Sequence, residues 1–449
     1  MAGIRQRLLK LSRRPEARHV GILTSGSVAA QVALVVTAPL LSRLFSPAAF
    51  GVFSLMLTIS TIGGAIGGLC YEVAVVLPRS RRVATALYWL AFYLSFFTPA
   101  VIIGAVALVQ HAFPHILGRL LPADFYYYCF AGTTLTTLVN VLSYAHSRAM
   151  QYTAVSVSKF SQTIFPAVAQ IALAYVGMGS EGLLLGRVIG MGGSILWLSH
   201  KLPLGFRMRD IVRQPLAPLF VAGRSYRDFL LQVPRQLLVR GSTMLPAALI
   251  LGSYGATAAG LYFFAARLIE RPGMLLGDSL TRVPMRQFAA RVQERKKLTR
   301  MALAYTAVMG APVIGGVVLL ALIAHPLFRI VFGVRWEDAA DYSVILAWWA
   351  AVRLTSLPMA TLTTVLRVQK LSFYVDAFFS LRVVIIPFLA HHHVGALAAV
   401  SAFCGLSILY HLIIVGVGVW SAMRYDRALR PPTHANENFA PIPTGESYG

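Results

Sequence analysis

Seven arginines lie inside long apolar stretches of this sequence, where a charged side chain is costly to place. They are Arg187, Arg235, Arg240, Arg267, Arg271, Arg353 and Arg382. An arginine that faces lipid at the centre of a bilayer costs about 2.5–3.5 kcal/mol. Such residues therefore face a partner or a water-filled interior, and the guanidinium fork matches phosphate oxygens well. We predict that the seven arginines line a cavity that binds an anionic substrate.

The acidic residues in the same stretches are too few to pair with all seven arginines. They are Glu72, Glu270, Asp278 and Asp376, which we predict to be coupling or ion-pair groups. At helical spacing, an arc of about 100° contains four charged residues, namely Arg267, Glu270, Arg271 and Asp278. Pro272 follows directly and predicts a kink in the backbone at this point.

The elements that hold these residues are transmembrane helices. The chain has 449 residues, of which 57% are hydrophobic and 12% charged, against about 25% charged in a soluble domain. About 20 apolar residues in a helix cross the hydrocarbon core, and helices satisfy their backbone groups internally. We predict an all-α integral membrane protein with about 12 transmembrane helices. The predicted spans are 22–44, 50–77, 84–109, 124–147, 154–177, 182–200, 229–252, 257–280, 301–325, 340–365, 372–390 and 394–420.

The basic residues outside the spans predict the orientation. With the N-terminus inside, 29 Lys and Arg residues fall on the cytoplasmic side and only four on the other side, namely Arg43, Arg119, Arg329 and Arg335. Cytoplasmic loops carry such an excess of basic residues. We predict that both termini are cytoplasmic. This asymmetry accounts for most of the net charge of +24, so no nucleic-acid partner is expected, whereas membrane lipids are.

The chain divides into two halves with a faint internal repeat. Phe50-Gly51-Val52-Phe53 and Ala259-Gly260-Leu261-Tyr262 each follow a proline-containing helix and a short turn. Two six-helix halves of the same orientation predict two pseudo-symmetric lobes around a central cavity. The predicted segments are a basic cytoplasmic N-terminal segment (1–20), an N-terminal lobe (21–200), a basic linker (201–228), a C-terminal lobe (229–420) and a disordered cytoplasmic tail (421–449).

No cluster in the sequence has the composition of a catalytic or metal centre. Cys70, Cys129 and Cys404 lie in apolar stretches without metal-ligand spacing. The histidines at 391–393 fall in a predicted turn, where surface histidines are the ordinary interpretation. We predict no metal site, no cofactor and no enzymatic activity.

Four stretches of the sequence form recognisable motifs, namely PLLSRLFSPAAFG at 39–51, YEVAVVLP at 71–78, YRDF at 226–229 and VFGVRWEDA at 331–339. They resemble the bacterial polysaccharide and O-antigen flippases of the multidrug/oligosaccharidyl-lipid/polysaccharide exporter superfamily. The resemblance covers roughly 20–420. It implies a protein of the bacterial inner membrane that moves undecaprenyl-diphosphate-linked oligosaccharide to the periplasmic leaflet by alternating access. It also implies polysaccharide polymerase machinery as a candidate partner. The glycan and the energy source are not specified.

Two other functions are open at this stage. One is a cation-coupled drug or metabolite antiporter of the same superfamily, against which the excess of arginine over acid argues. The other is a membrane-embedded polysaccharide polymerase or ligase. Such enzymes usually need a sizeable extramembrane loop, and no paired carboxylates or Ser/His cluster appear in the short periplasmic loops.

The topology can be tested with reporter fusions. A reporter fused at Ser253 or His392 is expected to report the periplasm, and one fused at Arg295 or Arg427 the cytoplasm. The reason is the placement of these positions in alternate loops of the predicted topology. A cytoplasmic signal at Ser253 would contradict the span assignments from the sixth span onward.

Overall fold

The computed structural model describes residues 15–112, 124–200, 202, 216–366 and 368–429. Side chains at 15–24, 271–280 and a few other helix positions lie outside this description. The described residues form helices and turns, with no strand among them. This confirms the predicted all-α class.

The first half of the chain forms the N-lobe. Its helices are α2 (Pro15–Leu44), α3 (Pro47–Ile66), the short α4 (Tyr71–Ala74), α5 (Arg81–Ala112), α7 (Phe125–Arg148), α8 (Tyr152–Tyr175) and α9 (Ser180–His200). The linker between the lobes contains α10 (Leu216–Ser225), which packs on α5, and the 3₁₀ helix η2 (Arg227–Leu231).

The second half forms the C-lobe. Its helices are α11 (Gln232–Tyr254), α12 (Ala256–Gln293), α13 (Thr299–Val331), η3 (Val334–Trp336), α14 (Ala339–Val365), α15 (Gln369–Ser380), η4 (Leu381–Val384), α16 (Ile385–His391) and α17 (Ala396–Ala428). Six membrane-length units therefore make up each lobe, because α3 with α4, and α15 with η4 and α16, each form one unit.

Nine described helical segments are long and apolar enough to cross a membrane. α7, α8 and α12 are not among them, because their polar residues lower the mean hydropathy. The polar residues of α7 lie inside the bundle, since Thr133, Thr134 and Thr137 are all buried. Buried polar side chains of this kind make contacts between membrane helices.

Several predicted boundaries were wrong. The predicted span 50–77 breaks at 67–70, where Leu69 and Cys70 both have positive φ. The predicted span 372–390 is interrupted by η4. α17 continues to Ala428, so 421–428 is helical and only 430–449 of the predicted tail lies outside the described residues. α12 runs as one helix past Pro272, and the kink expected there stays a prediction.

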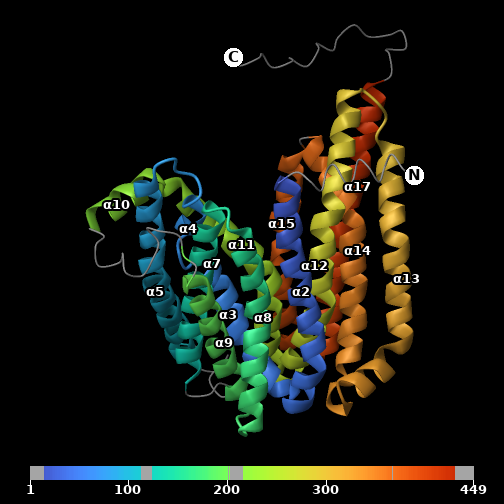
Figure 1. The fold of residues 1–449 in the computed structure, drawn as a ribbon. Coiled ribbons are helices and arrows are strands. Elements are labelled where there is room, and N and C mark those ends of the chain that lie inside the picture. Colours follow the sequence, from blue (N-terminus) through green and yellow to red (C-terminus); the bar gives the residue numbers. More distant parts are fainter. Residues whose placement is uncertain (1–14, 113–123, 201, 203–215, 367, 430–449) are drawn as a thin grey trace, which may run out of the picture.

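Both described chain ends lie at the same end of the bundle (Figure 1). This is the basic end, which also carries Arg81, Arg148, Arg291 and Arg424. The opposite end, called the far end here, contains the last turn of α2 and the first turns of α3, α12 and α14. An even number of crossings returns the chain to the side on which it began.

α3 and α12 cross with their backbones in contact at the far end. A Cβ atom added to Gly51 would lie 1.9 Å from the carbonyl oxygen of Ala256, and one added to Gly260 would lie 1.7 Å from that of Pro47. The two contacts are equivalent, because each glycine follows the first residue of its helix by four positions and meets the first residue of the other helix. The repeat seen in the sequence is therefore a symmetric crossing in space.

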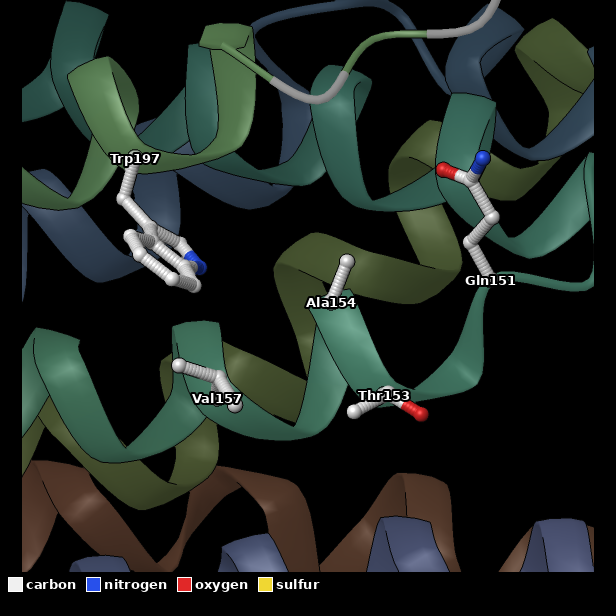
Figure 2. Close-up of a pocket in the computed structure, with 5 residues that line it drawn as sticks. All are labelled: Gln151, Thr153, Ala154, Val157 and Trp197. Atoms are coloured by element: carbon white, nitrogen blue, oxygen red, sulfur yellow. The ribbon is translucent and has the colours of Figure 1, made fainter.

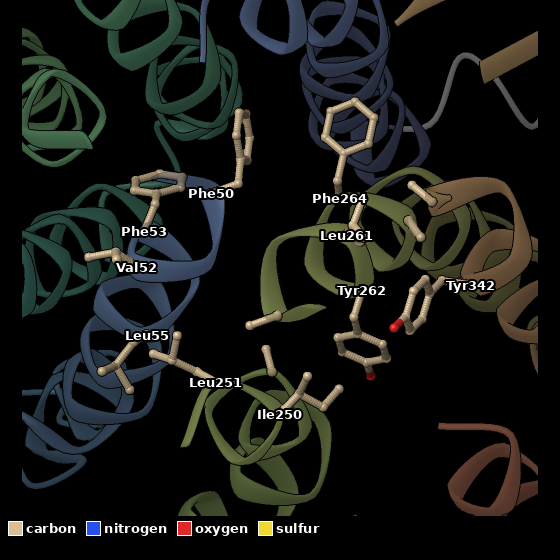
Figure 3. Packing of buried hydrophobic residues seen from close by; sticks show 14 of the residues in the cluster. Phe50, Val52, Phe53, Leu55, Ile250, Leu251, Leu261, Tyr262, Phe264 and Tyr342 are labelled. Carbon is tan, nitrogen blue, oxygen red and sulfur yellow. The ribbon is translucent and has the colours of Figure 1, made fainter. Parts of the chain in front are cut away.

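The buried apolar residues show how the lobes are joined. One cluster at the far end combines both lobes, with Phe50 and Phe53 from α3 and Ile250, Leu261 and Phe264 from α11 and α12 (Figure 3). At the basic end, the described buried clusters stay within single lobes. One packs α4, α5, α7 and α10 together, and another packs α12, α13, α14 and α17. In Figure 1, α4, α5 and α10 of the N-lobe stand apart from α13, α14 and α17 of the C-lobe at the basic end.

The glycine crossing can be tested by substitution. Gly51→Ala and Gly260→Ala are each expected to lower the free energy of unfolding by about 1–3 kcal/mol, because a methyl group must push two backbones apart. Thermal unfolding of the detergent-solubilised protein measures the effect. Gly316→Ala on α13 is the control, since an added Cβ atom there meets nothing within 4 Å. Equal stability of all three variants would contradict the close crossing.

Candidate functional site

Two of the predicted arginines act on the same histidine inside the C-lobe. Arg353 lies near the middle of α14, and Arg382 lies in η4, between α15 and α16. Both are half-buried. His411, near the middle of α17, interacts electrostatically with both guanidinium groups. Three helices that are separated in sequence thus place two cations around one imidazole.

Aromatic rings hold the guanidinium of Arg382. Its central carbon lies 5.7 Å from the ring centroid of Phe403 and 5.6 Å from that of Tyr410. One terminal nitrogen donates to the carbonyl oxygen of Phe379 at 2.7 Å. The Nε atom is buried and has no hydrogen-bond partner among the described residues. Arg382 therefore retains donor capacity while its position is fixed.

The acidic residues predicted nearby do not neutralise this pair by direct bonding. Asp376 accepts a hydrogen bond of 2.6 Å from the Tyr410 hydroxyl group. Glu270 on α12 is 9% exposed and interacts electrostatically with Tyr262 and Cys404, which also interact with Arg382. Neither carboxylate forms an ion pair within 4 Å with Arg353 or Arg382.

The other predicted arginines occupy different positions. Arg267 is half-buried on α12, one turn before Glu270. Arg235 and Arg240 are exposed along α11, and Arg240 interacts electrostatically with Tyr144 of the N-lobe. Arg187, the N-lobe member, donates to the Gln162 carbonyl oxygen at 3.2 Å. The side chains of Arg271 and Asp278 lie outside the described residues.

Glu72 lies in the N-lobe, away from the C-lobe cluster. It is 3% exposed at the break between α3 and α4, and its Oε2 atom has no hydrogen-bond partner among the described residues. Gly68 makes room for it, because a Cβ atom there would lie 2.3 Å from Oε2. Tyr144 interacts electrostatically with both Glu72 and Arg240. The charges of Glu72 and of Arg240 on α11 therefore both act on Tyr144.

The far end is closed by an aromatic plug around Trp336 of η3. The fully buried indole donates from Nε1 to the Ser42 carbonyl oxygen at 2.8 Å. Its ring centroid lies 5.2 Å from that of Phe50 and 4.3 Å from that of Phe264. Arg43 adds a bond of 3.2 Å to the Ile330 carbonyl oxygen. This plug joins α2 and α3 of the N-lobe to α12, α13 and η3 of the C-lobe.

A cavity of about 500 Å³ opens in the N-lobe beside Trp197 of α9 (Figure 2). Its other lining residues are Gln151, Thr153, Ala154 and Val157, at the basic end of α8. None of the five is charged, so this cavity does not have the chemistry of an anion site.

Sequence reasoning missed Ser356, Tyr410, His411 and Trp336. Hydroxyl, phenol and indole groups are common in membrane helices, and their spacing gives no signal of a shared site, whereas a histidine is rare there. Tyr410 and His411 stand together in an apolar stretch. An adjacent tyrosine and histidine at mid-span was the one available signal.

The fold is similar to those of several membrane transporters of known structure. The structure matches the lipid II flippase MurJ in an inward closed conformation, with a TM-score of 0.62 and 11% identity; the match covers 90% of this chain and 90% of that one. It also matches an inward-facing multidrug resistance MATE family transporter, with a TM-score of 0.54 and 14% identity over 91% of this chain and 94% of that one. A MOP superfamily transporter from Pyrococcus furiosus has a TM-score of 0.50 and 14% identity, over 94% of this chain and 98% of that one.

The family follows from the sequence match. Residues 40–341 match the model of the family described as polysaccharide biosynthesis protein. The chain therefore belongs to this family. No curated protein matches the chain.

The plug can be tested by the accessibility of a buried position. Trp336→Ala is expected to expose Ala259→Cys to a membrane-impermeant maleimide, because losing the indole removes about 3–5 kcal/mol of packing. Trp336→Phe, which loses the bond to Ser42, should have a smaller effect. Labelling rates of the purified protein, with the native cysteines replaced, measure the change.

The control for this experiment is Trp420→Ala, because Trp420 is 48% exposed on α17. It should leave labelling unchanged. Unchanged labelling in Trp336→Ala as well would show that the plug does not close the far end.

Proposed function

We propose that this protein is a flippase for undecaprenyl-diphosphate-linked oligosaccharide, a repeat unit of an exopolysaccharide or O-antigen. The cargo moves from the cytoplasmic to the periplasmic leaflet of the bacterial inner membrane without a chemical step. The observation that carries the proposal is that Arg353 and Arg382 both lie near His411 inside the C-lobe and form no ion pair with any acidic residue that the structure describes.

The charge of the site supports an anionic cargo. Two guanidinium groups around one interior point match a diphosphate, whose oxygens accept parallel hydrogen bonds from arginine forks. Arg235 and Arg240 on the exposed face of α11 extend the positive charge toward the basic end. Membership of the polysaccharide biosynthesis family supports a glycan, and the MurJ fold supports a lipid-linked one.

The arrangement of the lobes supports alternating access. With the basic end in the cytoplasm, as the distribution of lysine and arginine predicts, the lobes separate toward the cytoplasm and the Trp336 plug closes the periplasmic side. Cargo then enters from the leaflet where lipid-linked units are made. Both termini are cytoplasmic in this arrangement, and polysaccharide polymerase machinery is a candidate recipient of the cargo.

Substitution of the arginines tests the proposal. Arg267→Ala and Arg353→Ala are expected to abolish surface polysaccharide in a strain that depends on this gene, at matched protein abundance. Arg267→Lys should transport more than Arg267→Ala and less than wild type, because lysine keeps the charge and loses the fork. Surface polysaccharide is quantified by immunoblotting.

The control variant is Arg329→Ala, an exposed arginine at the far end of α13. It should transport normally, because it lies outside the C-lobe interior. Normal export by both Arg267→Ala and Arg353→Ala would contradict the proposed anionic cargo site.

A further inference from the structure

His411 lies near both cations of the C-lobe and feels the charge of each. Its ring centroid lies 4.8 Å from that of Tyr410, over which Arg382 lies at 5.6 Å. Its Nδ1 atom lies 3.1 Å from Ser356 Oγ, three residues after Arg353 on α14. An anionic group bound by both arginines would therefore lie beside this imidazole.

The hydrogen bonds of Ser356 define which ring nitrogen is available. The Ser356 hydroxyl donates its proton to the carbonyl oxygen of Arg353 at 2.7 Å, so toward His411 it can only accept. The Nδ1 atom of His411 is consequently the donor in that bond. The Nε2 atom of the neutral ring keeps its lone pair and makes no hydrogen bond among the described residues.

The surroundings of the ring couple its charge to that of the cargo. Burial disfavours the charged ring, the two nearby guanidinium charges add repulsion, and the negative charge of a bound diphosphate offsets both effects. Binding of a proton and binding of the anion must then strengthen each other by the same factor. The imidazolium also gains a donor, because Nε2 carries a hydrogen only in that state.

We propose that His411 takes up a proton at Nε2 when a diphosphate binds between Arg353 and Arg382, and that it donates a third hydrogen bond to this cargo. The inference rests on the proposed function and assigns a proton-linked residue to the same site. The proton comes from solvent and is returned when the cargo leaves, so no bond within the cargo changes.

The other titratable groups on the helices around α17 do not replace His411 in this role. Asp376 of α15 is bonded to Tyr410, and the buried Glu270 of α12 acts on Cys404, two turns before His411 on α17. On α13, Tyr305 packs against Phe288 and His325 lies 3.0 Å from Asp341. On α16, His391 is the last residue of the helix, at the far end.

Binding of farnesyl diphosphate to the full-length protein in detergent tests the proposal between pH 6 and pH 8. When the pH is raised from 6 to 8, the dissociation constant of the wild type is expected to rise about tenfold more than that of His411→Asn. The reason is that one linked proton changes affinity by up to tenfold per pH unit. The asparagine amide can still donate to Ser356, and the diphosphate's own titration is common to both proteins. His325→Asn is the matched control and should keep the slope of the wild type.

A pH indicator in weakly buffered solution gives a second measurement. Binding near neutral pH should take up about one proton more per ligand in the wild type than in His411→Asn or His411→Gln. Equal slopes and equal proton uptake in wild type and variants would overturn the proposal while leaving the diphosphate site intact. No binding of farnesyl diphosphate by the wild type at any pH would overturn the proposed function as well.

Discussion

The constraint on which this structure depends is an excess of arginines over acidic residues inside the membrane-spanning helices. Lipid cannot solvate a guanidinium, so each buried arginine needs rings, carbonyl oxygens or water around it. Arg382 illustrates the solution, because two aromatic faces and the carbonyl of Phe379 hold it. The helix breaks at η4, which places that arginine against α17. The remaining donor capacity is what an anionic cargo would use.

Most of the fold was predictable because lipid imposes a length and a composition on every crossing. All twelve predicted spans correspond to helical units of the structure. The wrong helix boundaries lie at positions where the local composition does not predict a break in the helix. Leu69 and Cys70 adopt positive φ in a stretch as apolar as its surroundings. Neither leucine nor cysteine is a residue type that predicts a turn. The helical extension to Ala428 was missed because it leaves the apolar stretch and continues in basic residues.

The candidate site was predictable only in part. The position of charged residues in apolar stretches identified Arg353, Arg382, Glu270 and Asp376, since charge is rare in such stretches. The exposure of Arg235 and Arg240 depends on the divergence of two lobes, which no local pattern encodes.

The uncharged residues of the site, such as Ser356, could not be predicted from the sequence, because their role arises from a contact between helices that are far apart in the chain. Trp336 is a related case, since the VFGVRWEDA stretch marked the segment but not its partner at Ser42.

The symmetric crossing at Gly51 and Gly260 has a consequence for how such a chain can arise. A contact on a two-fold axis is isologous, so each half presents the same surface to the other. A half-length chain carrying one copy of this helix would make both contacts with a second copy of itself. Fusing two such copies keeps the crossing and frees the halves to diverge elsewhere. The concentration of intramembrane arginines in the C-lobe, with Arg187 alone in the N-lobe sequence, is the kind of specialisation that a homodimer of identical halves could not have.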